Sequence, residues 1–372
     1  MLYMYMNITD MSNKKISRES PVPLYIQLKE LIKGQIAEGV LKPGASLPSE
    51  RELCKLYGVS HITVRQALIE LTKEGLLFRS PGRGTFVKPE RFIRRHESIV
   101  LGVVIPELRE NLSPHFTSEM LLGVKSLVES YRFTLVLYTE NEIDYLVDSS
   151  TSKLDGLILT NPMIKDTRLS MLKRKQTPFV VIGRGNEDEV YTVDNDNEAI
   201  GYLLSVHFLK AGHNRIGFIN GPSHLTVSED RLKGYKKALK QYGIKIEEDL
   251  IMFGDFSEDN GYEKAKKLVD KKVSAIICAD DFIALGVLRF LKEKGIKIPN
   301  EISIAGCNNS SFTRHTNPPL TTVEIFPCEL GRKAGEKLLK LIKGENVELR
   351  SIVDHKLIVR ESSFKKQRIE RG

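Results

Sequence analysis

Four polar side chains within the segment SHITVRQAL share one face of a predicted helix: His61, Thr63, Arg65 and Gln66. The apolar residues Val64, Leu68 and Leu71 recur at i, i+4 and i+7, so they must face the other way, toward a core. Imidazole, hydroxyl, guanidinium and amide groups can form hydrogen bonds with the edges of DNA bases. The spacing therefore predicts a helix that presents such groups to DNA, with Ser60 as its N-terminal cap.

A second set of polar and aromatic side chains follows a series of apolar runs farther along the chain. It comprises Ser113, His115, Phe116, Arg184, Arg231, Asp255, Phe256, Asp280, Asp281 and Asn308. Carboxylates, guanidinium groups and an amide around an aromatic face suit a polyhydroxylated ligand, because each hydroxyl group both donates and accepts hydrogen bonds. Two members also have structural interpretations, since Asp281 can cap the helix that begins FIALG and Arg184 can pair with an acid.

The elements around the predicted DNA-binding helix form a small helical module. The segment LYIQLKELIKGQI places apolar residues at intervals of three and four, which predicts a first helix. Ser49 and Glu52 then form a capping box that starts a short helix, and Gly58 is placed to end it. Two short helices separated by GVS predict a helix-turn-helix, whose second helix enters the major groove. Arg51, in the first turn of the earlier helix, is either a solvated side chain or a DNA contact.

The stretch RSPGRGTFV predicts a hairpin with a cationic tip. Leu76, Leu77 and Phe78 begin a strand, SPGRG turns the chain, and TFV returns as a second strand. Glycines around an arginine can also form a phosphate-binding loop, but that motif needs a helix after it, and a strand follows here. Gly82 lets the backbone approach DNA closely, and Arg83 at the tip can contact either phosphates or the minor groove.

Charge is divided unevenly along the 372-residue chain, whose formal net charge is +8. Residues 1–98 hold 16 Lys and Arg against 10 Asp and Glu, whereas the rest of the chain is nearly neutral. A basic N-terminal module attached to a neutral body indicates a polyanionic partner for the module alone. The four cysteines stand far apart without a metal-binding spacing, so we expect free thiols, no metal and no cofactor.

The segment LPSERELCKLYGVSHITVRQALIELTKEGLLFRSPGRGTFV resembles the winged helix of the GntR family of bacterial transcription regulators over nearly its whole length. The resemblance implies a DNA-binding domain at residues 21–87 that contacts operator DNA through Arg51, Thr63, Arg65, Gln66 and Gly82. The predicted helix and wing add Ser60, His61 and Arg83 to this set. His61 departs from the family pattern, since many members have arginine after the capping serine.

The residue pattern changes after the basic module. Residues 88–98 are charged and lack a regular period, which predicts a linker. From Ile99 onward, apolar runs such as VLGVVIP, GLILT and SAIICAD alternate with amphipathic stretches. Continuous apolar strands between helices indicate parallel sheets covered on both faces, and the number of units indicates two doubly wound lobes. We therefore expect an α/β fold whose ligand binds beyond the carboxyl ends of the strands.

Residues 99–364 resemble the effector domain of the LacI family and its relatives, the periplasmic sugar-binding proteins. The stretches responsible are VDNDNEAIGYLLSVHFLKAGHNRIGFINGP, ADDFIALG, and IAGCNNS followed by NPPLTTV. The resemblance implies a ligand site between two lobes, lined by Arg231, Asp280 and Asn308, with Phe256 stacking on the ligand. His213 is interpreted as structural. The expected lobes are residues 99–193 with 325–345, and residues 194–324 with 346–364.

The two resemblances together predict a ligand-responsive transcription regulator that binds operator double-stranded DNA as a homodimer. The joined architecture looks like the arabinose repressor type, which implies a repressor released from DNA by a sugar. A nucleobase or nucleoside effector is the alternative; a sugar-processing enzyme is a weaker one, because no GxSxG, P-loop or HExxH motif occurs. The chain shows neither an export-signal pattern nor an apolar run of eighteen residues, so we expect a cytoplasmic protein without a membrane partner.

Overall fold

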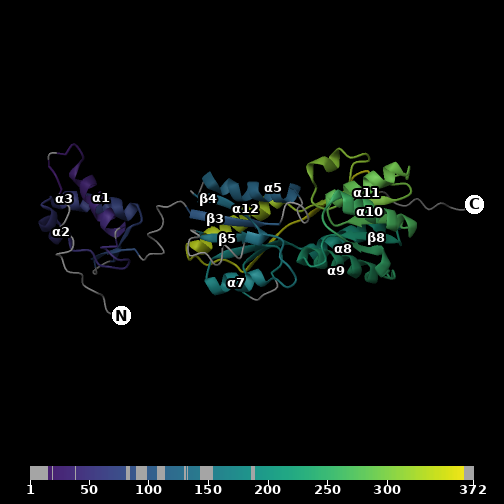
Figure 1. The fold of residues 1–372 in the computed structure, drawn as a ribbon, viewed down its shortest axis with the longest axis horizontal. Coiled ribbons are helices and arrows are strands. Elements are labelled where there is room, and N and C mark those ends of the chain that lie inside the picture. Colours follow the sequence, from purple (N-terminus) through teal and green to yellow (C-terminus); the bar gives the residue numbers. More distant parts are fainter. Residues whose placement is uncertain are drawn as a thin grey trace, which may run out of the picture. The chain divides into compact units, whose positions relative to one another are not determined.

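The computed structural model describes residues 16–18, 20–37, 39–80, 84–88, 99–106, 114–129, 131, 133–142, 154–185 and 189–363. The chain divides into two compact units, Met1–Ser98 and Ile99–Gly372, and each is described by itself (Figure 1). None of the helices in these ranges is long and apolar enough to cross a membrane. The expected linker lies at the junction of the two units, and its residues 89–98 fall outside the described ranges.

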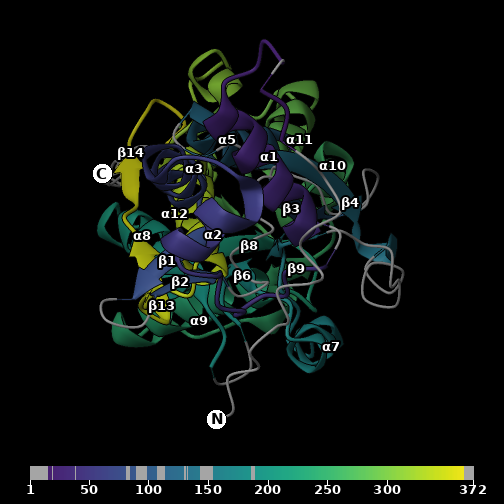
Figure 2. The same cartoon turned by 90° about the vertical axis from the view of Figure 1, so that its left-hand side faces the viewer.

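The first unit packs three helices around a small apolar core. Figure 2 shows α1 (Leu24–Ala37), α2 (Glu50–Tyr57) and α3 (His61–Lys73). Apolar side chains at the predicted helical spacing are almost completely buried and meet in this core, among them Leu28, Ile32, Leu53, Val64 and Leu68. The predicted capping box is confirmed, because Ser49 Oγ accepts a hydrogen bond from Glu52 N and the Glu52 carboxylate accepts one from Ser49 N.

A two-stranded wing follows the third helix. Strand β1 (Leu77–Ser80) pairs antiparallel with β2 (Gly84–Val87), with Leu77 opposite Val87 and Ser80 opposite Gly84. This register confirms the predicted hairpin. The side chains of Phe78 and Phe86 stack with ring centroids 5.5 Å apart, which stabilises the strand pair. The tip residues Pro81, Gly82 and Arg83 lie outside the described residues.

The second unit begins with a lobe built on a six-stranded parallel sheet. Its strand order is β13 (Arg350–Val353), β7 (Thr192–Asn195), β6 (Phe179–Ile182), β5 (Gly156–Leu159), β3 (Ile99–Ile105) and β4 (Phe133–Thr139). Helices α5 (Pro114–Lys125) and α12 (Pro327–Ile342) share one apolar core with the sheet, and α7 (Thr167–Lys175) shares another. Figure 1 shows α5 and α7 on opposite sides of the strands, as predicted for a doubly wound sheet.

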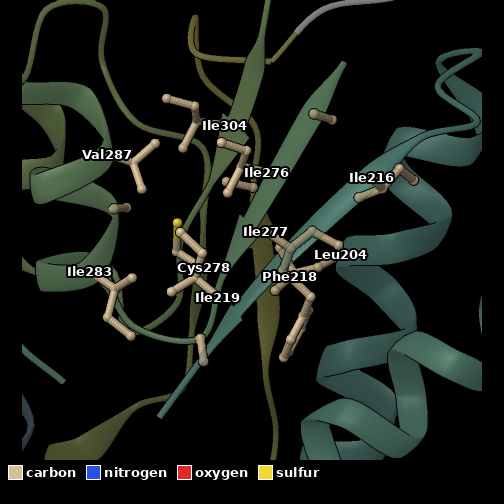
Figure 3. Close-up of a cluster of buried hydrophobic side chains, with 14 of the residues drawn as sticks. Leu204, Ile216, Phe218, Ile219, Ile276, Ile277, Cys278, Ile283, Val287 and Ile304 are labelled. Atoms are coloured by element: carbon tan, nitrogen blue, oxygen red, sulfur yellow. The ribbon is translucent and has the colours of Figure 1, made fainter. Parts of the chain in front are cut away.

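The other lobe has a four-stranded parallel sheet in the order β11 (Ser303–Ala305), β10 (Ala275–Cys278), β8 (Ile216–Asn220) and β9 (Ile251–Phe253). Its helices are α8 (Asn197–Lys210), α9 (Thr226–Gln241), α10 (Glu258–Asp270) and α11 (Asp281–Glu293). Figure 3 shows the core of this lobe, where side chains of β8 and β10 pack between α8 and α11. A short antiparallel pair, β12 (Thr322–Glu324) with β14 (Lys356–Ile358), completes it.

We expected residues 346–364 in the second lobe, and this is wrong for β13, which pairs in parallel with β7 at the edge of the first lobe's sheet. The next strand, β14, pairs with β12 of the second lobe, as expected. The chain therefore crosses between lobes three times, after β7, after β12 and after β13. The side-chain amide of Asn195, at the first crossing, donates to Ile325 O and Val353 O, both at 3.0 Å, and to Asp354 O at 3.2 Å. One side chain thus connects all three crossings.

Helices that cover the sheets are paired in backbone contact at glycines. A Cβ added to Gly201 of α8 would overlap the carbonyl oxygen of Arg231 on α9, and one added to Gly234 of α9 would overlap that of Glu198 on α8. The same reciprocal arrangement joins α10 with α11 and α5 with α12, through Gly261, Gly286, Gly123 and Gly331. Each pair can approach this closely only because neither partner has a side chain at the crossing.

Candidate functional site

The predicted DNA-binding residues lie on the solvent-facing side of the helix-turn-helix. Most of these side chains are exposed, namely those of Arg51, Ser60, His61, Arg65 and Gln66, and that of Thr63 is half-buried. The apolar side chains on the opposite face of α3 are buried in the core. Ser60 Oγ accepts a hydrogen bond from Thr63 N at 3.2 Å, which fixes the N-terminal end of α3. Ile62, with 80% of its surface exposed, lies on the same side and is the kind of apolar group that can contact a thymine methyl.

The sequence did not reveal an acid that connects this helix with the wing. Glu50, the first residue of α2, accepts from His61 Nε2 at 3.0 Å and from the guanidinium group of Arg79 on β1. The carboxylate therefore contacts an imidazole from α3 and a guanidinium group from the wing. The available signal was the arginine in LFRS, which points outward from a strand beside the predicted wing tip.

A cleft between the two lobes of the second unit brings together most of the predicted ligand residues. Its empty volume is about 670 Å³, including space open to solvent. Polar side chains from both lobes face it, and its apolar walls include Phe116 of α5 and Phe256, which precedes α10. The predicted members that line it are Phe116, Arg184, Arg231, Phe256, Asp280 and Asn308.

The Arg231 side chain is held at the cleft by partners from two neighbouring elements. It is 5% exposed, its Nε donates to Asn197 Oδ1 at 3.1 Å, and its Nη1 donates to the carbonyl of Ala279. Asn197 lies at the start of α8 and Ala279 follows β10, so the guanidinium group is fixed before a ligand arrives. A fixed cation of this kind can donate charge-assisted hydrogen bonds to ligand oxygens.

Asp280 and Asn308 form a hydrogen-bonded pair on the same wall. Asp280 is the N-cap of α11, with Oδ1 accepting from Phe282 N at 2.7 Å, and Oδ2 accepts from Asn308 Nδ2 at 2.5 Å. The capping role that we considered for Asp281 therefore belongs to Asp280. Asp281 is buried away from the cleft, where it accepts from Ser310 N and Thr322 Oγ1, and burial raises the pKa of its carboxyl group.

Other candidates from the sequence lie elsewhere. His115 is half-exposed and is not part of the cleft wall, and Asp255 accepts hydrogen bonds from Ser257 within its own turn. Ser113 lies outside the described residues. His213 is buried, and its Nδ1 lies 3.0 Å from Ser274 Oγ at the start of a strand, in keeping with a structural role. The described part of the chain contains no His, Cys, Asp and Glu cluster that could hold a metal ion.

Asp194, a cleft residue that we did not predict, is the last residue but one of β7 in the first lobe. Its Oδ1 accepts from Asn195 N at 2.8 Å and from Asn197 Nδ2 at 3.0 Å. Burial raises the pKa of its carboxyl group to about 7, although the hydrogen bond from Asn195 N opposes that rise. The signal was the TVDN run, in which an acid stands at the carboxyl end of a buried strand.

Arg184 joins the lobes as well as lining the cleft. It follows β6 in the first lobe, and it pairs with Glu229 and Asp230 on α9 of the second. Its Nε lies 2.7 Å from Asp230 Oδ2 and its Nη2 lies 2.5 Å from Glu229 Oε2. The structural interpretation of Arg184, pairing with an acid, is therefore confirmed, and its partners lie across the cleft.

Each of the two units matches a known protein family. Residues 24–87 match the model of bacterial regulatory proteins of the gntR family, and residues 206–363 match the model of the periplasmic binding protein-like domain. The chain is 32% identical over 284 residues to the HTH-type transcriptional regulator CelR of Thermobifida fusca, which covers 72% of this chain and 82% of that protein. The chain belongs to the bacterial transcriptional regulators that have a LacI-type effector domain, here joined to a gntR-type winged helix.

A relative that matches both units is the arabinose metabolism transcriptional repressor of Geobacillus stearothermophilus. It is 28% identical over 368 residues, which cover 93% of this chain and 99% of the relative. Among solved structures, the complex of the transcriptional regulator CelR with cellobiose aligns with a TM-score of 0.66 and 26% identity, over 85% of this chain and all of that one. The expectation that the chain is a transcription regulator and not an enzyme is confirmed.

Proposed function

We propose that the chain represses carbohydrate-utilisation genes and is released from operator DNA by a sugar bound between its lobes. The observation that supports this most directly is the cleft, in which Arg231, Asp280 and Asn308 are fixed beside the ring of Phe256. Hydrogen-bonding groups around an aromatic ring suit the hydroxyl groups and apolar face of a sugar. The relatives named for arabinose metabolism and cellobiose point to the same class of ligand.

The proposed DNA contacts are made by Arg51, Ser60, His61, Thr63, Arg65 and Gln66, with Gly82 and Arg83 at the wing tip. We propose that the chain acts as a homodimer in the cytoplasm, because one winged helix contacts only a half-site and a second copy supplies the rest of the affinity. Sugar binding stabilises one arrangement of the lobes. It releases DNA if that arrangement holds the two winged helices at a spacing that does not fit the operator.

The test measures binding of the full chain to a duplex from upstream of its own gene by fluorescence anisotropy. L-Arabinose, D-ribose, cellobiose and hypoxanthine are added in turn. We expect one of the sugars to weaken DNA binding at least tenfold. An effect from hypoxanthine alone, or from none of the four, would contradict the sugar assignment, and the absence of any sequence-specific DNA binding would contradict the regulator itself.

A variant separates the effector cleft from the DNA-binding unit. Arg231→Ala removes the fixed guanidinium group, so we expect DNA binding at wild-type strength but no release at sugar concentrations that release the wild type. Intact DNA binding also shows that the variant is folded. A variant that is released at the wild-type sugar concentration would contradict the placement of the sugar beside Arg231.

A further inference from the structure

The contact that carries this inference is the ion pair between lobes formed by Arg184 with Glu229 and Asp230. The guanidinium group offers two N–H groups to two carboxylates, at 2.7 Å and 2.5 Å, a fork geometry that lysine could not reproduce. The Asp230 side chain is 13% exposed, and those of Arg184 and Glu229 are 36% and 34% exposed. The pair is therefore partly screened by solvent but well ordered in geometry.

A backbone contact between the lobes lies close to this ion pair in sequence and in space. Thr226 N donates to Pro162 O at 3.0 Å, and Ile164 N donates to His224 O at 2.8 Å, so the loop after β5 meets the segment that starts α9. Gly183, directly before Arg184, packs on Pro162 so closely that a Cβ would overlap the proline ring. The ion pair and the backbone contact therefore join two neighbouring segments of the first lobe, after β5 and after β6, to the same N-terminal part of α9 in the second lobe.

We propose that Arg184 is a positioning residue for the effector, which acts by holding the lobes closed and not by contacting the sugar. The inference rests on the proposed function of the cleft. The pair joins different lobes, so it can form only while they are close, and it adds its free energy to the closed state alone. A sugar that contacts both walls of the cleft must supply the free energy that closes the lobes. The ion pair supplies part of it, so the sugar binds more tightly.

Two observations favour this role over direct sugar binding. The Nε and Nη2 groups of Arg184 already donate to carboxylates, and neither Glu229 nor Asp230 belongs to the cleft wall. Lys233 also pairs with both acids, at 3.1 Å and 3.5 Å, but it lies on α9 itself. Its ion pairs lie within the second lobe and do not depend on the position of the first. Lys233 is therefore a matched control, because its loss removes a positive charge near the same acids without removing a contact between the lobes.

The experiment compares four full-length proteins with the wild type: Arg184→Gln, the double variant Glu229→Gln/Asp230→Asn, all three substitutions together, and Lys233→Gln. Affinity for L-arabinose is measured by calorimetry. We expect about a threefold to tenfold loss in the first two and no additional loss when they are combined, because each removes the same pair. Lys233→Gln should stay within about twofold of the wild type, and 0.5 M salt should shrink the losses.

Hydrogen–deuterium exchange gives a second readout that needs no sugar. We expect the amides of Ile164 and Thr226, which donate across the lobes, to exchange about threefold to tenfold faster in Arg184→Gln and in the acid double variant. If the wild type binds no L-arabinose but exchange accelerates as expected, the choice of sugar fails and the closure role stands. Unchanged exchange overturns the closure role, and so does a loss of affinity in Arg184→Gln that the acid variant does not share.

Discussion

Replacing Gly201 with alanine should weaken effector binding, although Gly201 does not line the cleft. The added methyl group would lie about 1 Å inside the 3.0 Å limit of real Cβ contacts with the carbonyl oxygen of Arg231, and within 2.8 Å and 2.9 Å of its carbonyl carbon and Cα. All three are backbone atoms, so the contact can be relieved only if α9 moves away from α8. Overpacking of this kind costs about 1–3 kcal/mol of folding free energy.

The same movement displaces the guanidinium group from the cleft. Arg231 is held by Asn197 of α8 at 3.1 Å, and a shift of about 1 Å breaks that hydrogen bond. Losing one charge-assisted hydrogen bond to the sugar costs roughly 1.5–3 kcal/mol, which corresponds to a loss of affinity of about tenfold to a hundredfold. Calorimetric titration with L-arabinose measures the loss, and thermal unfolding measures the cost in stability.

Gly34→Ala is the matched control, because Gly34 lies in a helix of the first unit and its added Cβ would meet no atom within 4 Å. It should leave the affinity for sugar unchanged and slightly stabilise α1. DNA binding without sugar should be of wild-type strength in Gly201→Ala. If Gly201→Ala binds sugar and unfolds like the wild type, the close approach of α8 and α9 does not position Arg231, and the reasoning fails.

Three further predictions concern other groups. Arg65→Ala should weaken operator binding by about 1–3 kcal/mol and binding to a scrambled duplex by much less, as measured by anisotropy; equal losses would remove its base-contacting role. The pKa of Asp194 is about 7 in the folded protein, above the ordinary 3.8, so ionising the carboxyl group destabilises the folded state. In chemical denaturation, the free energy of unfolding of the wild type should fall relative to that of Asp194→Asn between pH 4 and 7, by up to about 4 kcal/mol, and should not change further above pH 8. Ser49→Ala should cost about 1 kcal/mol in the unfolding of the first unit, because Glu52 N loses its acceptor; an unchanged transition would show that water replaces the cap.

Local sequence patterns were sufficient for most of the first unit. The capping residues Ser49 and Ser60, the left-handed Gly58 and the strands on either side of the wing tip all act within a few residues of their own position. The apolar period of α3 left only one face for DNA, so its exposed residues followed from the core. Glu50 was missed because its partners, His61 and Arg79, come from other elements that meet it only in the folded unit.

Long-range pairing limited the prediction for the second unit. Strand β13 has only four residues, which do not indicate the sheet to which it belongs, and its partner strand β7 lies more than 150 residues earlier. The sequence analysis therefore assigned β13 to the wrong lobe. The carboxyl ends of the parallel strands correctly indicated the cleft, including Asp280 and Asn308. The same rule could not separate Asp280 from Asp281, because a difference of one residue at a helix N-terminus decides which carboxylate caps and which is buried.

The hydrogen bonds of Asn195 determine how the lobes can move. A chain that passes between two bodies three times could bend independently at each passage, and the bodies could then twist, slide or separate in many ways. Here a single amide is bonded to the backbone at the other two passages, so bending at one strains the bonds at the others. The three passages are therefore coupled through Asn195, so a bend at one of them must be accompanied by movement at the others or by loss of these hydrogen bonds.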